Sequence, residues 1–119
     1  MAWEVEYTDE WGAWFADLDE GQQDAVGAVV TLLQDLGPDL PFPYGSGIGQ
    51  SRHSHMRELR IQYRGRPLRT LYAFDPRRVG ILLFGGDKTG DDRWYDRSVP
   101  IADRLYDEYL AELKREGLL

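Results

Sequence analysis

The stretch from Met56 to Lys88 most constrains how this chain can fold, because it holds three strand-like runs joined by two very short connections. The runs extend from Arg57 to Arg64, from Leu68 to Asp75 and from Val79 to Phe84. The first alternates apolar and polar residues, as half-buried strands do, and the other two are apolar runs of strand length. Glycine and proline in the connections favour tight turns, and strands joined by such short turns pair as hairpins. The stretch therefore predicts a three-strand antiparallel meander.

Periodicity and capping residues indicate the elements on either side of the meander. The segment Trp3 to Tyr7 alternates large apolar residues with glutamate, which is typical of a further strand of the same sheet. Apolar stripes at helical spacing, preceded by capping residues, predict two helices before the meander and one after it. These helices cover Asp9 to Leu18, Asp19 to Leu36 and Ser98 to Glu116, the last with Pro100 in its first turn. Residues 38–54 carry three prolines and then three glycines, which predicts a long irregular loop.

The order of these elements predicts one α+β domain spanning residues 1–119. In this two-layer fold, an antiparallel sheet made of the N-terminal strand and the three-strand meander packs with two N-terminal helices and a C-terminal helix. The chain has no cysteine, which excludes disulfides and thiolate metal sites. The sequence shows neither a signal peptide nor an apolar run of about 20 residues, so we expect a cytoplasmic protein with no membrane segment.

Charge is unevenly distributed along the chain. The net charge is −7, which argues against nonspecific binding of nucleic acid by the whole surface. Acidic residues gather in the first 40 and the last 30 positions, whereas arginine occurs eight times from Arg52 to Arg78, where Glu58 and Asp75 are the only acids. The pattern predicts a basic sheet framed by acidic helices. It is compatible with a local anion-binding site on that sheet.

Four short segments carry a resemblance to a known family through their order and spacing. They are LGPDLPFP after the second predicted helix, and MRELR, RTLYAFDP and ILLFGGDK in the meander. Together with the order of elements, they resemble the RelE/ParE toxin superfamily, and most closely its HigB-like, phage-derived branch of type II toxin–antitoxin toxins. The similarity spans the chain from Trp3 to about Leu113.

The resemblance implies a small toxin that cleaves mRNA in the ribosomal A site without a metal or small-molecule cofactor. A cognate antitoxin, usually of the helix-turn-helix type, would hold it inactive. The matching catalytic positions are Arg57, Arg69 and Lys88. This chain has Thr89 where members of the branch often carry a second lysine, and it is acidic overall. Its acidity favours an alternative, a non-catalytic member that acts by binding, as a gyrase inhibitor does, or an inactive toxin bound by its antitoxin.

Metal-free RNA cleavage needs a base for the 2′-hydroxyl, stabilisation of the phosphate charge and an acid for the 5′-oxygen. Arginine supplies only the positive charge, because its pKa is above about 12. Arg57, Arg60 and Arg69 are therefore candidate phosphate-binding residues, and Lys88 could stabilise charge or donate a proton. Strand alternation places Arg57 and Arg60 on opposite faces of the sheet. For Glu58, the sequence favours an ion pair with Arg60 or Arg69 over a role as the base.

His53 and His55 are the candidate bases, because imidazole titrates near neutral pH and both residues lie just before Arg57. The alternative is that they are solvated histidines at the end of a loop rich in glycine and serine. A third ligand at metal-binding spacing is missing from the sequence, so no metal site is predicted.

The segment DDRWYDR after the meander contributes three further candidates. Arg93 and Trp94 are candidate RNA-binding residues and Tyr95 is a candidate catalytic residue, because a cation and two aromatic rings can hold an unstacked base. The alternative is that Trp94 and Tyr95 only anchor the last helix.

Overall fold

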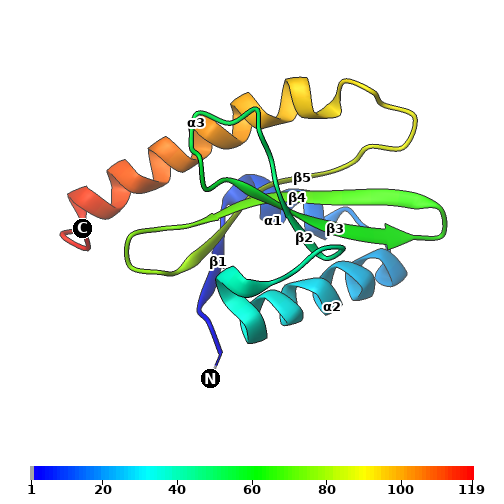
Figure 1. The fold of residues 1–119 in the computed structure, drawn as a ribbon, viewed down its shortest axis with the longest axis horizontal. Coiled ribbons are helices and arrows are strands. Elements are labelled where there is room, and N and C mark those ends of the chain that lie inside the picture. The colour runs from blue at the N-terminus through cyan, green and yellow to red at the C-terminus, as the bar shows by residue number, and fades with distance from the viewer. Residues whose placement is uncertain (1) are drawn as a thin grey trace.

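The computed structural model describes residues 2–119, and all of the strands assigned there belong to one sheet. Figure 1 shows the sheet in the middle of the molecule, with α2 on one side and α3 on the other. Among the described residues, no helix is long and apolar enough to cross a membrane. In chain order the elements are β1 (Val5–Tyr7), α1 (Asp9–Ala16), α2 (Glu20–Leu36), the short 3-10 helix η1 (Gly37–Asp39), β2 (Gly45–Gly47), β3 (Arg57–Tyr63), β4 (Arg66–Phe74), β5 (Gly80–Asp87) and α3 (Trp94–Arg115).

Five strands form the sheet in the order β1-β5-β4-β3-β2. β3, β4 and β5 pair antiparallel one after another, which confirms the predicted meander. β1 runs parallel to β5 at one edge, and β2 pairs antiparallel with β3 at the other. The predicted α+β class is confirmed, with its N-terminal strand, two N-terminal helices and C-terminal helix. The parallel pairing of β1 makes the sheet mixed rather than wholly antiparallel.

The two faces of the sheet bury two separate apolar clusters. Helices α1 and α2 cover one face, where Leu33 of α2 packs with Leu82 of β5. Helix α3 covers the other face, where Leu105 packs in a cluster with Ile81 and Leu83. Successive residues of a strand point to opposite faces, so β5 needs apolar residues at every position. The continuous apolar run in this strand follows from its burial on both sides.

Capping residues fix the starts of the first two helices where the sequence predicts them. The side chain of Thr8 accepts a hydrogen bond of 3.0 Å from the backbone N–H of Trp11. Asp19 and Gln22 form a reciprocal capping box at the start of α2. These bonds satisfy backbone donors that a helix N-terminus would otherwise leave unpaired.

The layer formed by α1 and α2 is negatively charged throughout. Residues 2–51 contain no lysine, arginine or histidine, and α1 and α2 both begin with acidic residues. The basic residues begin at Arg52, and many of them lie on β3, on β4 and in the turns beside these strands. The predicted contrast between a basic sheet and acidic helices is therefore found in the fold.

Three segments differ from the sequence-based expectation. β2 lies inside the predicted irregular loop, because a strand of glycine and serine has no apolar alternation to reveal it. β5 continues through Gly85 and Gly86 to Asp87, beyond the predicted end of the strand at Phe84. Helix α3 begins at Trp94 rather than at Ser98, because Trp94 is buried in the cluster under α3. Pro100 consequently lies inside the helix and not in its first turn.

Two adjacent glycines in β5 let a tryptophan lie directly on each face of the strand. A Cβ atom at Gly85 would come within 2.2 Å of the Trp14 ring, and one at Gly86 within 2.4 Å of Trp94 Nε1. Trp14 belongs to α1 and Trp94 to the first turn of α3. The glycine pair therefore sets how closely both helices approach β5. Gly86 is also the register partner of Arg69, so this contact places the start of α3 beside β4.

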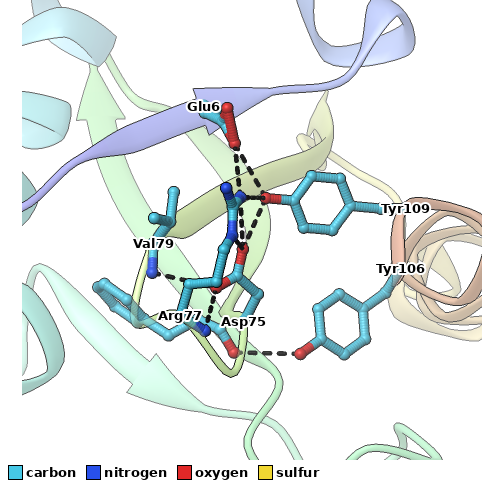
Figure 2. A network of polar contacts seen from close by, with 7 residues as sticks. Glu6, Asp75, Arg77, Val79, Tyr106 and Tyr109 are labelled. Atoms are coloured by element: carbon cyan, nitrogen blue, oxygen red, sulfur yellow. Dashed lines mark hydrogen bonds and ion pairs between the residues drawn. The ribbon is translucent and has the colours of Figure 1, made fainter. Parts of the chain in front are cut away.

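The buried carboxylate of Asp75 joins the turn between β4 and β5 to α3, as Figure 2 shows. Tyr109 donates its hydroxyl proton to Asp75 over 2.7 Å, and the Arg77 guanidinium donates over 2.9 Å. The backbone N–H groups of Arg77 and Val79 donate to the same carboxylate over 2.7 and 3.2 Å. Arg77 also donates to Glu6 over 3.2 Å, and the Tyr109 hydroxyl oxygen lies 3.0 Å from the same carboxylate, which extends the network to β1. Three distant parts of the chain are thus tied together.

Replacing Gly85 by alanine should destabilise the protein, because the Trp14 ring must move to admit a methyl group. We expect a loss of about 1–3 kcal/mol in the free energy of unfolding, measured by urea denaturation. Gly27→Ala in α2 is the matched control, because nothing lies within 4 Å of its Cβ position. Alanine there should raise the free energy of unfolding by about 0.5–1 kcal/mol. Equal stability of the wild type and Gly85→Ala would contradict the close packing described.

The Asp75 network predicts a pH-dependent stability. Burial alone would raise the pKa of Asp75, but the hydrogen bonds from Tyr109, Arg77 and Val79 hold this pKa below its usual value. The carboxylate therefore stabilises the fold above about pH 4, and this contribution is lost as the pH falls through the folded-state pKa. Asp75→Asn should lower the free energy of unfolding by about 1–3 kcal/mol at neutral pH.

Urea denaturation of wild type and Asp75→Asn from neutral to acidic pH measures this effect. The difference between the two proteins should shrink below about pH 4, where Asp75 of the unfolded wild-type chain begins to gain a proton, and should keep shrinking down to the lower folded-state pKa. Glu108→Gln is the control, because Glu108 is exposed and pairs with Arg104 one helical turn away. We expect a change of less than about 0.5 kcal/mol for this control. A difference that stayed constant down to strongly acidic pH would show that the Asp75 charge does not matter.

Candidate active site

A buried carboxylate, that of Glu58 in β3, organises a polar cluster on the α3 side of the sheet. Glu58 is 4% exposed, and Arg69 from the adjacent strand β4 is 5% exposed. Tyr95 reaches the carboxylate from the first turn of α3, and Ser46 reaches it from β2. Arg60 of β3 lies at the outer side of the group. These five residues are called the Glu58 cluster below.

Each oxygen of Glu58 has two partners. Tyr95 donates its hydroxyl proton to Oε1 over 2.5 Å, and Arg69 Nε lies 3.4 Å from the same oxygen. Ser46 donates to Oε2 over 3.0 Å, and Arg60 Nη1 donates to it over 3.5 Å. The ion pairs of Glu58 with both arginines confirm the pairing that strand alternation predicts.

Arg69 is the buried cation of the cluster, and its hydrogen bonding is incomplete. Its Nη1 donates to the carbonyl of Leu68 over 3.0 Å. The contact of its Nε with Glu58 lacks hydrogen-bond geometry, so within residues 2–119 this nitrogen has no hydrogen-bond partner. Because a guanidinium keeps its proton, Arg69 presents a permanent positive charge to an approaching anion.

Tyr95 is held as a proton donor beside a second cation. Burial and the hydrogen bond to Glu58 raise the pKa of Tyr95, an effect that nearby Arg69 partly offsets. The tyrosine therefore keeps its proton at neutral pH. Lys88 Nζ lies 5.7 Å from the centre of the Tyr95 ring. Four of the residues predicted from the sequence, Arg60, Arg69, Lys88 and Tyr95, are thus brought together.

Thr89 fixes the turn that carries Lys88. Its hydroxyl and its backbone N–H donate to Asp87 Oδ1 over 2.5 and 2.9 Å. Arg66 donates to the other oxygen of Asp87 over 2.8 Å. Burial alone would raise the pKa of Asp87, but the bonds from Thr89 and Arg66 lower it, so the carboxylate stays charged. At the position where the resemblance implies a second lysine, this chain therefore has a residue that orders the loop.

Arg57 lies on the opposite face of the sheet from Arg60, as the alternation of β3 predicts. Its Nε donates to the hydroxyl of Tyr72 over 3.3 Å, and its Nη2 donates to the carbonyl of Leu40 over 3.4 Å. Tyr72 belongs to the apolar cluster beneath α1 and α2. The structure therefore does not bring Arg57 to the Glu58 cluster, and a catalytic role for it stays a prediction.

His53 and His55 lie against the middle of α3. His53 Nε2 is 2.9 Å from a carboxylate oxygen of Asp107, and His55 Nε2 is 3.0 Å from the hydroxyl of Tyr106. Burial and the neighbouring His53 lower the pKa of His55. Tyr106 follows Tyr95 by eleven residues of the same helix, or about 16 Å along its axis. Neither histidine joins the Glu58 cluster, and the role of either as a base stays a prediction.

Trp94 and Arg93 flank Tyr95 but differ in exposure. Trp94 is 5% exposed and packs edge-on against Tyr95, with 5.2 Å between the ring centres. This burial matches the alternative reading in which the tryptophan anchors the last helix. Arg93 is exposed just before α3. Their predicted roles in RNA binding stay predictions.

A groove of about 420 Å³ adjoins the Glu58 cluster at the edge of β3. It shares Arg60 and Arg69 with the cluster. A smaller hollow of about 290 Å³ lies between His55, Arg57 and the start of the turn after β4, and shares no residue with the cluster. The full lining of the larger groove is Ala25, Val29, Pro43, Tyr44, Arg60, Ile61, Gln62 and Arg69.

Sequence reasoning identified the cations of this site but placed its centre elsewhere. Glu58 is an isolated acid in an arginine-rich stretch, and that isolation is the signal by which its central position could have been found. Ser46 carries no such signal, because it lies in the glycine-rich part of a predicted loop. Its contact with Glu58 depends on the pairing of β2 with β3, which the sequence does not reveal.

The arrangement can bind an anion and move a proton. Arg60, Arg69 and Lys88 supply positive charge, and the Tyr95 hydroxyl and the Glu58 carboxylate form a donor and acceptor pair. Phosphate is the anion that such arginine and lysine groups commonly bind. Across residues 2–119, no group of three or more histidine, aspartate and glutamate side chains is placed to hold a metal ion.

Two proteins of Mycobacterium tuberculosis (strain ATCC 25618 / H37Rv) are similar to this chain over most of its length. The one named "Putative toxin HigB3" is 41% identical over 99 residues, which cover 82% of this chain and 85% of that protein. The one named "Putative toxin HigB2" is 38% identical over 104 residues, or 86% of this chain. This chain spans about half of the second relative, 52% of its length. Both matches agree with the HigB-like resemblance, and placement in the wider RelE/ParE superfamily stays a prediction.

A family model described as phage-derived, Gp49-like protein matches residues 13–107. This range begins in α1, ends in α3 and contains every residue of the Glu58 cluster together with Lys88. The match agrees with the phage-derived branch that the four sequence segments indicate. The chain therefore belongs to the Gp49-like family of phage-derived proteins.

Proposed function

We propose that this protein is the toxin of a type II toxin–antitoxin system and that it cleaves mRNA on the ribosome, in the cytoplasm. We further propose that it is a single-domain member of the RelE/ParE superfamily. The observation that carries the proposal is the Glu58–Tyr95 pair, joined over 2.5 Å beside Arg60, Arg69 and Lys88. The names of the two relatives, "Putative toxin HigB3" and "Putative toxin HigB2", support it.

The proposed reaction is an attack of the RNA on itself, without a metal or a small-molecule cofactor. The 2′-oxygen bonds to phosphorus as the bond from phosphorus to the 5′-oxygen breaks, which leaves a 2′,3′-cyclic phosphate and a 5′-hydroxyl. The proton of the 2′-hydroxyl passes to the Tyr95 oxygen while Tyr95 gives its own proton to Glu58. Lys88 gives a proton to the departing 5′-oxygen. Arg69 stabilises the charge on the phosphate.

The partner required by this function is a cognate antitoxin, which we propose to be of the helix-turn-helix type. The neighbouring gene offers a direct test. A short helix-turn-helix reading frame beside this gene, whose product copurifies with the protein and relieves growth arrest, would support the assignment. Growth arrest that no neighbouring product relieves would count against it.

A non-catalytic toxin that acts by binding is the second candidate. The acidity of the chain favours it, because the net charge is −7 and residues 2–51 carry no basic side chain. A negative surface repels RNA over most of the molecule. In this alternative, the Glu58 cluster would only hold β3, β4 and α3 together.

Tyr95→Phe and Lys88→Gln separate the two candidates. Each substitution removes one proton-transfer group and leaves the buried ion pair of Glu58 and Arg69 intact. We expect each variant to lower cleavage by about 100-fold or more, the usual effect of losing a positioned acid or charge-stabilising group. The measurement is the mapping of new 5′-hydroxyl ends in mRNA after induction in cells.

Arg104→Ala and Lys114→Ala are the controls, because both residues are exposed basic residues of α3 with no predicted role in the site. Both should keep cleavage near the wild-type level. Loss of cleavage in His55→Ala would move the base to the histidines. Growth arrest by the wild type without new 5′-hydroxyl ends would rule out the nuclease and support the binding alternative.

A further inference from the structure

Two exposed aromatic side chains lie next to the candidate active site. Phe42 is 69% exposed and Tyr44 is 44% exposed, although aromatic side chains are usually buried in a small domain. Both belong to the segment before β2. The Arg60 guanidinium lies 5.1 Å from the centre of the Phe42 ring. One arginine therefore contacts both an exposed aromatic ring and the carboxylate of Glu58.

The backbone holds this aromatic segment in a fixed position against β3. The N–H of Arg60 donates to the carbonyl of Tyr44 over 2.8 Å. The N–H groups of Tyr44 and Gly45 both donate to the carbonyl of Pro41 over 3.0 Å. Because the turn is closed by its own hydrogen bonds and tied to a strand, its side chains are presented without a large ordering cost on binding.

The groove beside these aromatics has the size and the chemistry of a site for a flat, polar ring. Its volume is about 420 Å³, within the usual range for small-ligand sites. Pro43, Tyr44 and Ile61 offer apolar or aromatic surface, and Arg60 and Gln62 offer hydrogen-bonding groups. Arg69 also lines the groove, and its Nε is the buried donor without a hydrogen-bond partner within residues 2–119.

Unpaired RNA bases are recognised by this combination of groups. A base presents a flat face for stacking on an aromatic ring and a polar edge for arginine and amide side chains. The exposed rings are Phe42 and Tyr44, whereas Trp94, the stacking candidate from the sequence, is buried. The groove shares Arg60 and Arg69 with the Glu58 cluster, so a base held there belongs to a nucleotide next to the phosphate at the cluster.

We infer that the groove at the edge of β3 binds an unpaired nucleobase beside the scissile phosphate. Tyr44 lines the groove, and Phe42 lies outside its lining but contacts Arg60, which does line it. These two rings supply the stacking surface, and Arg60 and Gln62 contact the polar edge of the base. This inference rests on the proposed nuclease function, because it names a substrate subsite of the same active site. According to this inference, the residues of the groove and of the segment before β2 select the cleavage site. The residues that transfer protons are a separate set.

Binding of short single-stranded RNA to a Tyr95→Phe protein tests the inference without cleavage of the probe. Fluorescence anisotropy compares labelled RNA oligonucleotides that differ in one position, which carries either a base or an abasic sugar. Phe42→Leu and Tyr44→Leu should each weaken binding of the intact RNA by about 5- to 100-fold, the effect of losing one base–aromatic stack. Phe42→Trp should keep the affinity, because it keeps the stacking surface.

Tyr7→Leu is the matched control, because Tyr7 is 63% exposed on β1 at the opposite edge of the sheet. It should leave RNA affinity unchanged. The Tyr95→Phe parent should bind the abasic RNA as weakly as the protein that also carries Phe42→Leu binds the intact RNA. Equal affinity of Phe42→Leu, Tyr44→Leu and the Tyr95→Phe parent for the intact RNA, or equal weakening for intact and abasic RNA, would overturn the inference. Failure of the Tyr95→Phe parent to bind any RNA would overturn it as well.

The bases that flank the cuts in cells distinguish this inference from the proposed function. Wild-type protein should produce 5′-hydroxyl ends with a preferred neighbouring base, and Phe42→Leu should lose that preference. If the wild type cuts and Phe42→Leu keeps both the preference and the affinity, the base site is wrong and the nuclease stands. If the wild type makes no cuts at all, the nuclease itself is wrong.

Discussion

The pairing of the buried Glu58 carboxylate with Arg69 is the interaction on which the rest of the structure depends. Burying an ion costs several kcal/mol unless an opposite charge and hydrogen bonds accompany it. The native fold therefore needs the partners of Glu58 to be in place. The partners come from β2, β4 and α3, three elements that are distant along the chain. A fold that failed to assemble any of them would leave a buried charge unpaired. The contacts that assemble the candidate site therefore also hold these elements of the fold together.

Helix α3 is positioned by contacts near each of its two ends. At its start, Trp94 packs on Gly86, where any larger residue would collide with the ring. Toward its other end, Tyr109 donates to the buried Asp75, and its hydroxyl oxygen lies 3.0 Å from Glu6. A helix held at two separated points cannot slide or rotate without breaking both contacts. Tyr95 consequently has a defined position relative to β3 and β4, as its proposed role in proton transfer requires.

The sequence predicts those parts of the fold that follow from short-range periodicity. The predicted meander and the first two predicted helices match the structure, because alternation, helical stripes and the caps at Thr8 and Asp19 act locally. The start of α3 could not be predicted, because Pro100 resembles a first-turn residue and only the burial of Trp94 moves the helix start forward. The site was predicted in part, since arginine positions show charge but not which side chains converge. Their convergence depends on strand register, and the short strand β2 has no sequence signal.

The separation of charge between the helical layer and the sheet has a consequence for how the molecule meets a polyanion. Residues 2–51 have no basic side chain, whereas the cations of the Glu58 cluster and Lys88 lie on the other side of the sheet. In the field of an RNA surface, such a protein experiences a torque that turns its positive side inward. The torque acts within the screening length, about 8 Å at physiological ionic strength. A net charge of −7 is therefore compatible with the proposed binding of RNA, provided that the side of the sheet that carries these cations turns toward the polyanion.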